Sequence, residues 1–159
     1  MPIVSSRVDE RLVHGQVAMV WVRVVGADRI IVANDEAVHS QMQIEALLLA
    51  KPAGVKLAIV SIQRAIKNIL AGKYDADRSF LITKNITDMK RLIAGGIGIK
   101  EFNVGNIAPR AGAQKIKNSV YLTPEDIDNL NEMIKAGIKI TAQMVPSESE
   151  ALITTFIKK

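Results

Sequence analysis

The sequence contains no cysteine and only two histidines. The absence of cysteine excludes disulfide scaffolds, zinc–thiolate sites and thiol nucleophiles. Two histidines are also too few for a multi-histidine metal site. Aromatic residues are scarce as well, with six scattered along 159 residues. Because nucleic-acid binders usually add aromatic stacking platforms to a basic groove, we expect no nucleic-acid partner.

Long hydrophobic runs are missing too. The longest uninterrupted apolar run covers residues 17–22, far short of the ~18 residues needed to span a bilayer. Charged residues stand where a signal peptide would carry its apolar stretch, namely Arg7, Asp9, Glu10 and Arg11. We therefore expect a cytosolic protein.

The composition is that of a globular protein. Apolar types make up 48% of the residues and charged types 23%, which excludes a disordered chain. The length of 159 residues predicts a single domain over residues 1–159. Lysine and arginine outnumber aspartate and glutamate by 21 to 16, so the net charge is +5. This excess favours an anionic substrate or an acidic partner surface, with ordinary solvated surface charge as the alternative.

Short β-branched or apolar runs recur along the chain and predict strands. They begin near Ile3, Arg29, Val55, Ser79, Glu101, Ser119 and Ile138. Between them lie segments with helical periodicity, and strand–helix–strand units of this spacing build an α/β fold. We expect an open, doubly wound, mostly parallel sheet with helices on both faces. The last two intervals are short for crossovers, so residues 101–122 are expected to hold a loop and an antiparallel edge strand.

Helix-end signals support this interpretation. Ser61 is a candidate N-cap, Thr123 followed by Pro124 is another, and Gly137 is expected to end the helix after Thr123. The first helix, Gly15–Val25, is apolar nearly all round, so it is either buried on most sides or faces a partner. We expect a core helix with Trp21 packed one turn from Val17.

The densest cluster of reactive side chains follows the first strand. Residues 8–17 read VDERLVHGQV and place Asp9, Glu10, Arg11, His14 and Gln16 in a strand-to-helix turn. Amides at a helix N-terminus favour an anion, an arginine adds bidentate donors, and a histidine is a nucleophile or base near neutral pH. The cluster indicates phosphate chemistry. In the alternative interpretation His14 only caps the helix and Arg11 pairs with a neighbouring acid.

The better-known phosphate and hydrolase motifs are absent. No G-x-x-x-x-G-K-[ST] sequence occurs, and Gly96 and Gly98 follow a helix and precede a strand, which is the wrong order for a dinucleotide loop. The third strand ends in Val60 and Ser61, without the aspartate of a receiver-type phosphoacceptor. There is no G-x-S-x-G elbow, so a serine hydrolase has no support.

Two further loops should open at the same end of the sheet, because ligands bind outside the carboxyl ends of parallel strands. Residues 103–112 include Gly105 and Asn106, which allow close backbone approach; a plain turn is the alternative. Asn34 and Asp35 follow the second strand, and Asp35 is equally explained as the N-cap of a helix over residues 36–50. His39 lies inside that predicted helix and is expected to be solvated.

Several ordered blocks carry a family resemblance. VDERLVHGQV, followed by Trp21, resembles the first loop of the IIB components of the mannose, fructose, sorbose and N-acetylgalactosamine family of the bacterial sugar phosphotransferase system. VANDE, GVK, FNVGN, EDI and QMVPSE also fall where that family has similar blocks. The similarity therefore covers nearly the whole chain.

The resemblance implies an open sheet of about seven strands and a phosphocarrier role for His14, with Nδ1 as the favoured ring nitrogen. Arg11 matches the loop arginine that neutralises charge on the phosphoryl group. Asp9 matches an acid that orients Arg11 or the loop. Gly15 and Gln16 stand at the helix entrance, and Gln16 would help to hold it. Gly105 and Asn106 match a glycine-rich block that faces the phosphate, and Asn34 and Asp35 are supporting candidates.

The resemblance also implies partners. In this family a phosphohistidine on a IIA protein donates the phosphoryl group, and a sugar handled by the membrane components IIC and IID receives it. The chain would then be a phosphotransferase subunit associated peripherally with the membrane transporter, needing no metal or cofactor. The sequence of the first loop favours an amino sugar such as N-acetylgalactosamine, or a mannose-type hexose, as the acceptor. Arg7, Arg11 and Arg110 are expected to steer the chain toward an acidic IIA surface.

Two other functions compete with this interpretation. A regulatory module could bind a phosphorylated ligand or nucleotide without any covalent step. A structural domain could dock through its apolar first helix, and substantial exposure of Trp21 would favour that function.

Overall fold

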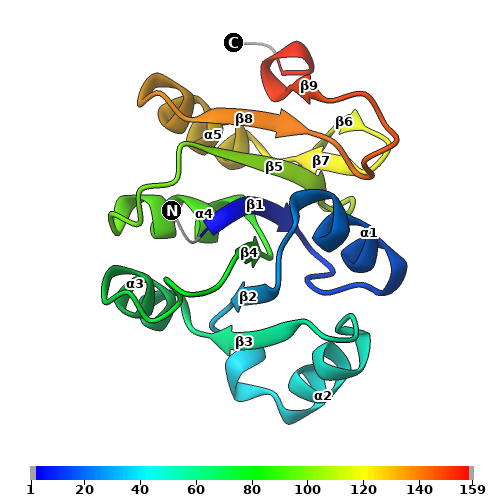
Figure 1. The fold of residues 1–159 in the computed structure, drawn as a ribbon. Coiled ribbons are helices and arrows are strands. Elements are labelled where there is room, and N and C mark those ends of the chain that lie inside the picture. The colour runs from blue at the N-terminus through cyan, green and yellow to red at the C-terminus, as the bar shows by residue number, and fades with distance from the viewer. Residues whose placement is uncertain (1–2, 158–159) are drawn as a thin grey trace.

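The computed structural model describes residues 3–157, apart from the side chains of Gln16 and Val17. Its main sheet has seven strands in the order β3-β2-β4-β1-β5-β8-β9, all parallel except β9, which runs antiparallel to β8 (Figure 1). The strands are β1 (Ile3–Asp9), β2 (Arg29–Ala33), β3 (Lys56–Val60), β4 (Ser79–Thr83), β5 (Glu101–Asn106), β8 (Lys139–Ala142) and β9 (Ala151–Leu152). A separate antiparallel hairpin consists of β6 (Gln114–Lys117) and β7 (Val120–Leu122).

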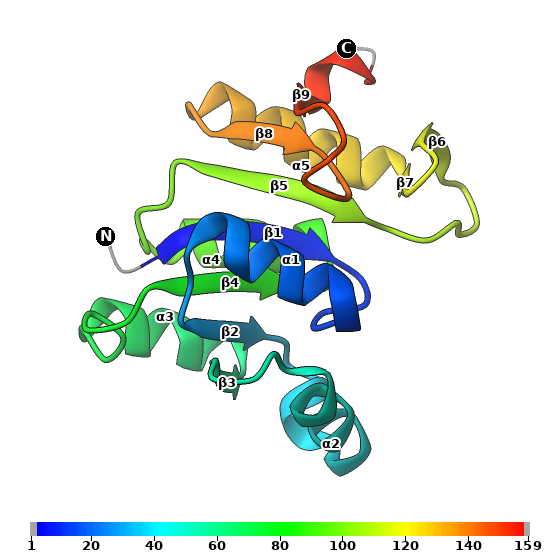
Figure 2. The same cartoon turned by 45° about the vertical axis from the view of Figure 1, so that its right-hand side comes forward.

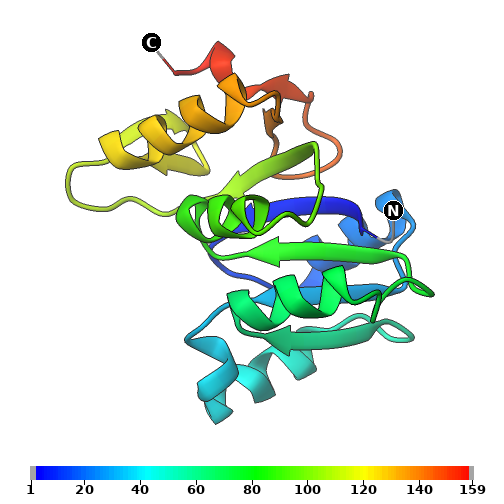
Figure 3. The ribbon, with the colours of Figure 1, turned by 90° about the vertical axis from the view of Figure 1, so that its left-hand side faces the viewer.

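Helices cover both faces of the sheet, as expected for a doubly wound fold. Figure 2 shows α1 (Gly15–Val25) in front of β1 and β4. This face is completed by α2 (Gln41–Ala50) beyond the β3 edge. Figure 3 shows the opposite face, which is covered by α3 (Ile62–Leu70), α4 (Ile86–Ala94) and α5 (Pro124–Lys135).

Each face has its own hydrophobic core. Beneath α3, α4 and α5 the core contains Leu81, Val104 and Ile140 of the sheet, and beneath α1 and α2 it contains Ile30, Val32 and Phe80. Burial of one such side chain stabilises the fold by about 1.5–3 kcal/mol. The helices therefore fix the strands on which the loops at the carboxyl edge depend.

The predicted fold class is confirmed, with one difference in the strands. All the expected strand positions hold strands, but the one expected near Ser119 is β7, which pairs with β6 outside the main sheet. The seventh strand of the main sheet is instead β9, which the sequence did not indicate. The physical reason is the short spacing after β5, since the chain forms a hairpin there before α5 crosses over to β8.

Several helix-end predictions are confirmed. Ser61 Oγ accepts the N–H of Arg64 at 3.1 Å, and Thr123 forms a reciprocal capping box with Asp126. The helix predicted over residues 36–50 is wrong in its start. A 3₁₀ turn, Ala37–His39, comes first, and α2 then begins after Ser40, whose hydroxyl accepts the N–H of Gln43.

Two further observations concern α1 and membranes. On α1, Ala18, Trp21 and Val22 are buried, whereas Met19, Val20 and Val24 remain exposed, so from Ala18 onward the helix is buried along one face. Within residues 3–157, no helix is both long enough and apolar enough to cross a membrane.

Candidate active site

The turn between β1 and α1 presents His14 to solvent. Leu12 N–H donates to the carbonyl of Asp9 at 2.9 Å, and Leu12 adopts a left-handed φ of 59° that is uncommon for a side chain of its kind. Leu12 and Val13 are buried against the α1 side of the sheet, and this packing holds the strained turn in place. His14 follows in extended conformation at the N-cap position, exposed and with no side-chain capping hydrogen bond. The interpretation of His14 as a helix cap is therefore not supported.

Gly15, the first residue of α1, is exposed and has a φ of 40°. This left-handed geometry lets the chain turn sharply from His14 into the helix. The first amides of an α-helix lack intrahelical acceptors and carry the positive end of the helix dipole. The imidazole of His14 thus stands beside a region suited to an anion.

The buried carboxylate of Asp9 is hydrogen-bonded to the turn. It accepts the backbone N–H of Arg11 and, from the Arg11 side chain, Nε on Oδ1 and Nη2 on Oδ2, each at 3.0 Å. Asp9 is only 2% exposed, whereas the side chain of Arg11 is 26% exposed. A bidentate pair of this kind fixes the orientation of the arginine as well as its charge. Asp9 therefore holds Arg11 three residues before His14, and this is the ion pair that the alternative interpretation of the cluster expected.

Arg7 lies below the same carboxylate, and its position corrects a prediction. Its side chain was expected to face a partner, but the residue is 2% exposed. Nε and Nη2 donate to Asp9 Oδ2 at 3.3 and 3.2 Å, and Nη1 and Nη2 donate to the carbonyls of Gln143 and Met144 at 3.0 and 2.7 Å. Burial lowers the pKa of Arg7, although the charge of Asp9 opposes this effect. An arginine nevertheless stays protonated under ordinary conditions.

Trp21 joins Arg7 and Asp9 in a buried cluster. Its ring lies 5.0 Å from Arg7 Cζ, and its Nε1 donates to the carbonyl of Met144 at 2.9 Å. Such a stacked cation adds attraction when it is desolvated. Trp21 is 8% exposed, so the observation that would have favoured a purely structural docking domain is missing.

The second loop meets the first through β5, the neighbour of β1. Asn106 O accepts the N–H of Glu10 at 2.9 Å. Arg110 Nη2 lies 2.6 Å from Glu10 Oε1, so this ion pair links the two loops. Position 105 requires a glycine for a steric reason, since a Cβ there would overlap Cζ and Nη2 of Arg7. The glycine leaves the space that the buried guanidinium fills.

The comparisons with known proteins agree with this arrangement. The family described as "PTS system sorbose subfamily IIB component" matches residues 3–159. The chain belongs to this family. It is thus a phosphoryl-transfer subunit of a sugar phosphotransferase system, a IIB component.

Individual relatives cover nearly the whole IIB chain. The N-acetylgalactosamine-specific phosphotransferase enzyme IIB component 2 of Escherichia coli K12 is 35% identical over 146 residues, 92% of each protein. The mannose-specific EIIAB component of the same strain is 32% identical over all of this chain, which covers 49% of that longer protein. The crystal structure of the IIBSor domain of the Klebsiella pneumoniae sorbose permease superposes with a TM-score of 0.93 at 32% identity, covering 98% of this chain and 95% of that one.

Other predicted site residues of the IIB component lie apart from His14. Asn34 and Asp35 follow β2, which β4 separates from β1 in the sheet. Asn34 Oδ1 accepts the N–H of Ala37, so it is Asn34 that caps the following turn. Asp35 instead accepts the N–H of Ile62 at the start of α3, and this bond lowers its pKa. Its predicted role as the cap of a helix over residues 36–50 is wrong.

Two more residues complete the account of the predicted site. The side chains of Gln16 and Val17 lie outside the described part of the structure, so the role of Gln16 at the helix entrance and the packing of Trp21 against Val17 stay predictions. His39 is exposed in the Ala37–His39 turn, as a solvated histidine should be.

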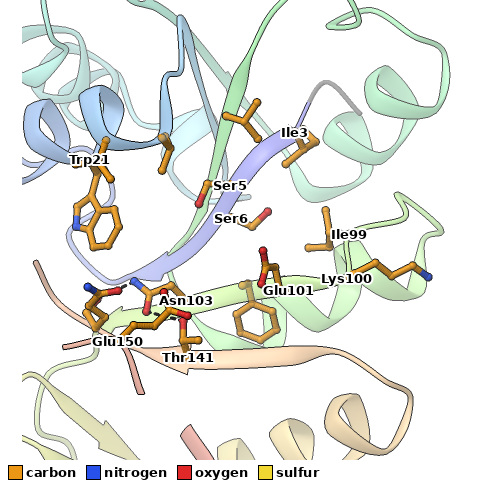
Figure 4. Close-up of a pocket in the computed structure, with 15 residues that line it drawn as sticks. Ile3, Ser5, Ser6, Trp21, Ile99, Lys100, Glu101, Asn103, Thr141 and Glu150 are labelled. Carbon is orange, nitrogen blue, oxygen red and sulfur yellow. Dashed lines mark hydrogen bonds between the residues drawn. The ribbon is translucent and has the colours of Figure 1, made fainter. Parts of the chain in front are cut away.

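A cavity of about 410 Å³ opens on the α1 side of β1, β5 and β8 (Figure 4). Trp21 forms part of its wall, and Asn103 and Thr141 lie along its floor, joined by a hydrogen bond of 3.2 Å. Asn103 Nδ2 also donates to the carbonyl of Gln143 at 2.7 Å. His14 is not among the lining residues of this cavity, whereas Trp21 and Gln143, which both contact Arg7, are.

Proposed function

We propose that His14 accepts a phosphoryl group from a phosphohistidine of a IIA partner. It then passes the group to a sugar bound by the membrane components IIC and IID. The observation that carries this proposal is the geometry of the first turn: His14 is exposed and uses no side-chain atom for capping, and Asp9 holds Arg11 nearby. The name of the mannose-specific EIIAB relative, in which A and B are parts of one protein, supports a IIA partner.

The chemistry requires positioning and neutralisation of charge more than acid–base catalysis. A ring nitrogen of His14 forms a bond to phosphorus while the phosphorus–nitrogen bond of the IIA phosphohistidine breaks, and the IIA imidazole leaves with the electron pair. In the second step a sugar hydroxyl oxygen attacks phosphorus and the bond to His14 breaks. The freed imidazole can take up the proton that the hydroxyl loses. No metal or other cofactor takes part in either step.

Two groups of this chain would act directly on the phosphoryl group. Arg11 offsets the charge on its equatorial oxygens, and the first-turn amides of α1 at Gly15 and beyond attract the same oxygens. Asp9 acts through Arg11. Gly105 and Asn106 support the loop from β5, whereas Asp35 acts at a greater distance through α3 and Asn34 through the Ala37–His39 turn.

The sugar and the place of action complete the proposal. An amino sugar such as N-acetylgalactosamine, or a mannose-type hexose, would receive the phosphoryl group, with the chain bound peripherally to the transporter. The 35% identity with an N-acetylgalactosamine-specific component supports the first of these sugars. Phosphorylation of each sugar by membranes that contain the matching IIC and IID would distinguish them.

The decisive experiment uses the general phosphotransferase proteins, a matching IIA and labelled phosphoenolpyruvate. We expect an acid-labile, alkali-stable label on His14 and no label on a His14→Gln variant. His39→Gln is a matched control, because His39 is the other histidine and is also exposed. A label that survives in His14→Gln, or that maps to His39, would contradict the proposal. Binding of phosphate without a covalent label would point instead to a regulatory module.

A further inference from the structure

We infer that Arg7 is a positioning residue for phosphoryl transfer: it is the permanent counter-ion that keeps Asp9 charged and in place while Arg11 is drawn to the phosphoryl group. The inference rests on the proposed function, since it takes the role of Arg11 at His14 as its starting point. It assigns a task to a buried cation that does not reach the reacting atoms.

The first step concerns how Arg11 is occupied. Its Nε and Nη2 both donate to Asp9, and its backbone N–H donates to the same carboxylate. A phosphoryl group on His14 therefore competes with Asp9 for the charge of Arg11. Arg11 sits on a loop with part of its side chain in solvent, so it is the partner that can move.

The second step concerns what this movement leaves behind. Asp9 is 2% exposed, and a buried carboxylate without a counter-ion is costly. Such a carboxylate takes up a proton or repels the nearby phosphoryl charge. While it stays charged, Asp9 would then hold Arg11 as its sole counter-ion and repel the phosphoryl group, and a proton on Asp9 would relieve both effects. A second cation must stay with Asp9 for the transfer to proceed with the turn intact.

The third step shows that Arg7 is fixed where Arg11 is mobile. Two of its nitrogens are bonded to the carbonyls of Gln143 and Met144, and its guanidinium lies over Trp21. The segment that supplies these carbonyls is itself held, because Met144 N–H donates to Glu148 at 2.8 Å. Arg7 therefore cannot follow the phosphoryl group, and it remains paired with Asp9.

An arginine suits this task better than a lysine. The planar guanidinium reaches one carboxylate and two carbonyls at once and stacks on an indole, whereas an ammonium is a compact point charge. The charged groups around Arg7 are Asp9 and Arg11 from β1 and its turn, and Glu148 from the segment after β8. Glu148 is paired in turn with Lys117 of β6.

The test is a single-turnover measurement of transfer from phosphorylated IIA to this chain between pH 6 and pH 8. Arg7→Met removes the charge but keeps an unbranched apolar side chain. We expect its rate, divided by the wild-type rate at the same pH, to rise as the pH falls from 8 to 6, by up to about 100-fold. In this variant a proton must replace the missing cation on Asp9, and the protonated fraction of a carboxyl changes by at most about tenfold per pH unit, which sets that upper limit. The division cancels any pH dependence that the variant shares with the wild type.

Two further variants separate charge from architecture. Arg7→Lys keeps the charge, so its rate relative to the wild type should be flat with pH, even if lower. Arg7→Met/Asp9→Asn should transfer faster at pH 8 than Arg7→Met alone and lose the pH dependence, because the amide needs no counter-ion. A wild-type rate for Arg7→Met at every pH, or a uniform slowing with a flat ratio, would overturn the inference and leave Arg7 a structural residue.

A measurement on the wild type keeps the inference testable if Arg7→Met fails to fold. The ¹³Cγ resonance of Asp9 should keep its ionised shift from pH 8 to pH 6, both before and after phosphorylation of His14. A protonated Asp9 in the phosphorylated protein would refute the inference. Failure of the proposed function looks different, since the wild type itself would then carry no label on His14.

Discussion

Gly105→Ala, which adds a single methyl group, should be one of the most destabilising glycine-to-alanine substitutions in this protein. A Cβ at this position would overlap Cζ and Nη2 of Arg7 and lie 2.5 Å from Nη1. The guanidinium can escape only by leaving Asp9 and the carbonyls of Gln143 and Met144. Breaking a buried ion pair costs about 3–5 kcal/mol, and we expect a loss of that size.

The control is Gly112→Ala, in the loop that follows. That position has a φ of 75° and no atom within 4 Å of an added Cβ, so the substitution costs only backbone strain of about 1–2 kcal/mol. Equilibrium unfolding in urea measures both variants. With a slope of about 2 kcal/mol per molar urea, Gly105→Ala should lower the unfolding midpoint by about 2 M and Gly112→Ala by less than 1 M.

A double-mutant cycle then tests the cause. In an Arg7→Met background the side chain that collides with the new methyl group is gone, so Gly105→Ala should cost much less than in the wild type. Equal costs of Gly105→Ala in both backgrounds would refute the reasoning, as would equal costs of the two glycine substitutions in the wild type.

Three other outcomes are expected. Arg11→Ala should slow phosphorylation of His14 in the transfer assay by at least about 100-fold without unfolding the protein. In other phosphotransfer enzymes, arginine contacts to a transferring phosphoryl group are worth roughly 10³–10⁵ in rate. Near-normal transfer would make Arg11 a purely structural partner of Asp9. Hydrogen bonds from Lys56 and Arg29 lower the pKa of Asp77, so this carboxylate stabilises the fold above about pH 4. The stabilisation is lost as the pH falls through the lowered pKa. Compared with the wild type, Asp77→Asn should have a lower Tm at pH 7, and its Tm should decrease less on acidification. Raising the salt from about 0.1 to 1 M shortens the Debye length from ~10 to ~3 Å and should slow transfer from subsaturating IIA, whereas an unchanged initial rate would show that apolar docking brings the partners together.

Local patterns were enough to predict much of the fold. The apolar run of Gly15–Val25 gave the bounds of α1, and the regular spacing of β-branched runs located the parallel strands. The two-residue strand β9 carries too little pattern to be recognised, since its pairing depends on the edge left open by β8. The start of α2 was misplaced because Asp35 and Ser40 are both good caps, and only tertiary contact with α3 decides that Asp35 bonds elsewhere.

The site was predictable where it is local. His14, Arg11 and Asp9 share one turn, so their proximity follows from the sequence. The burial of Arg7 was missed, since a charged residue is ordinarily exposed and its partners are distant in the chain. One signal was present, because residues 7 and 9 of a strand point to the same face, which places Arg7 beside Asp9. The carbonyl of Met144 and the space at Gly105 could come only from the folded chain.

Trp21 is the sole tryptophan of the chain, and its indole stacks on Arg7 while donating to the carbonyl of Met144. Its fluorescence therefore originates entirely from the buried cluster below His14. A change in the charge around Asp9 alters the field at the ring, so the emission of the unlabelled protein should change when the phosphoryl group arrives and return when it leaves. The molecule thus carries its own optical signal for following loading and unloading in real time.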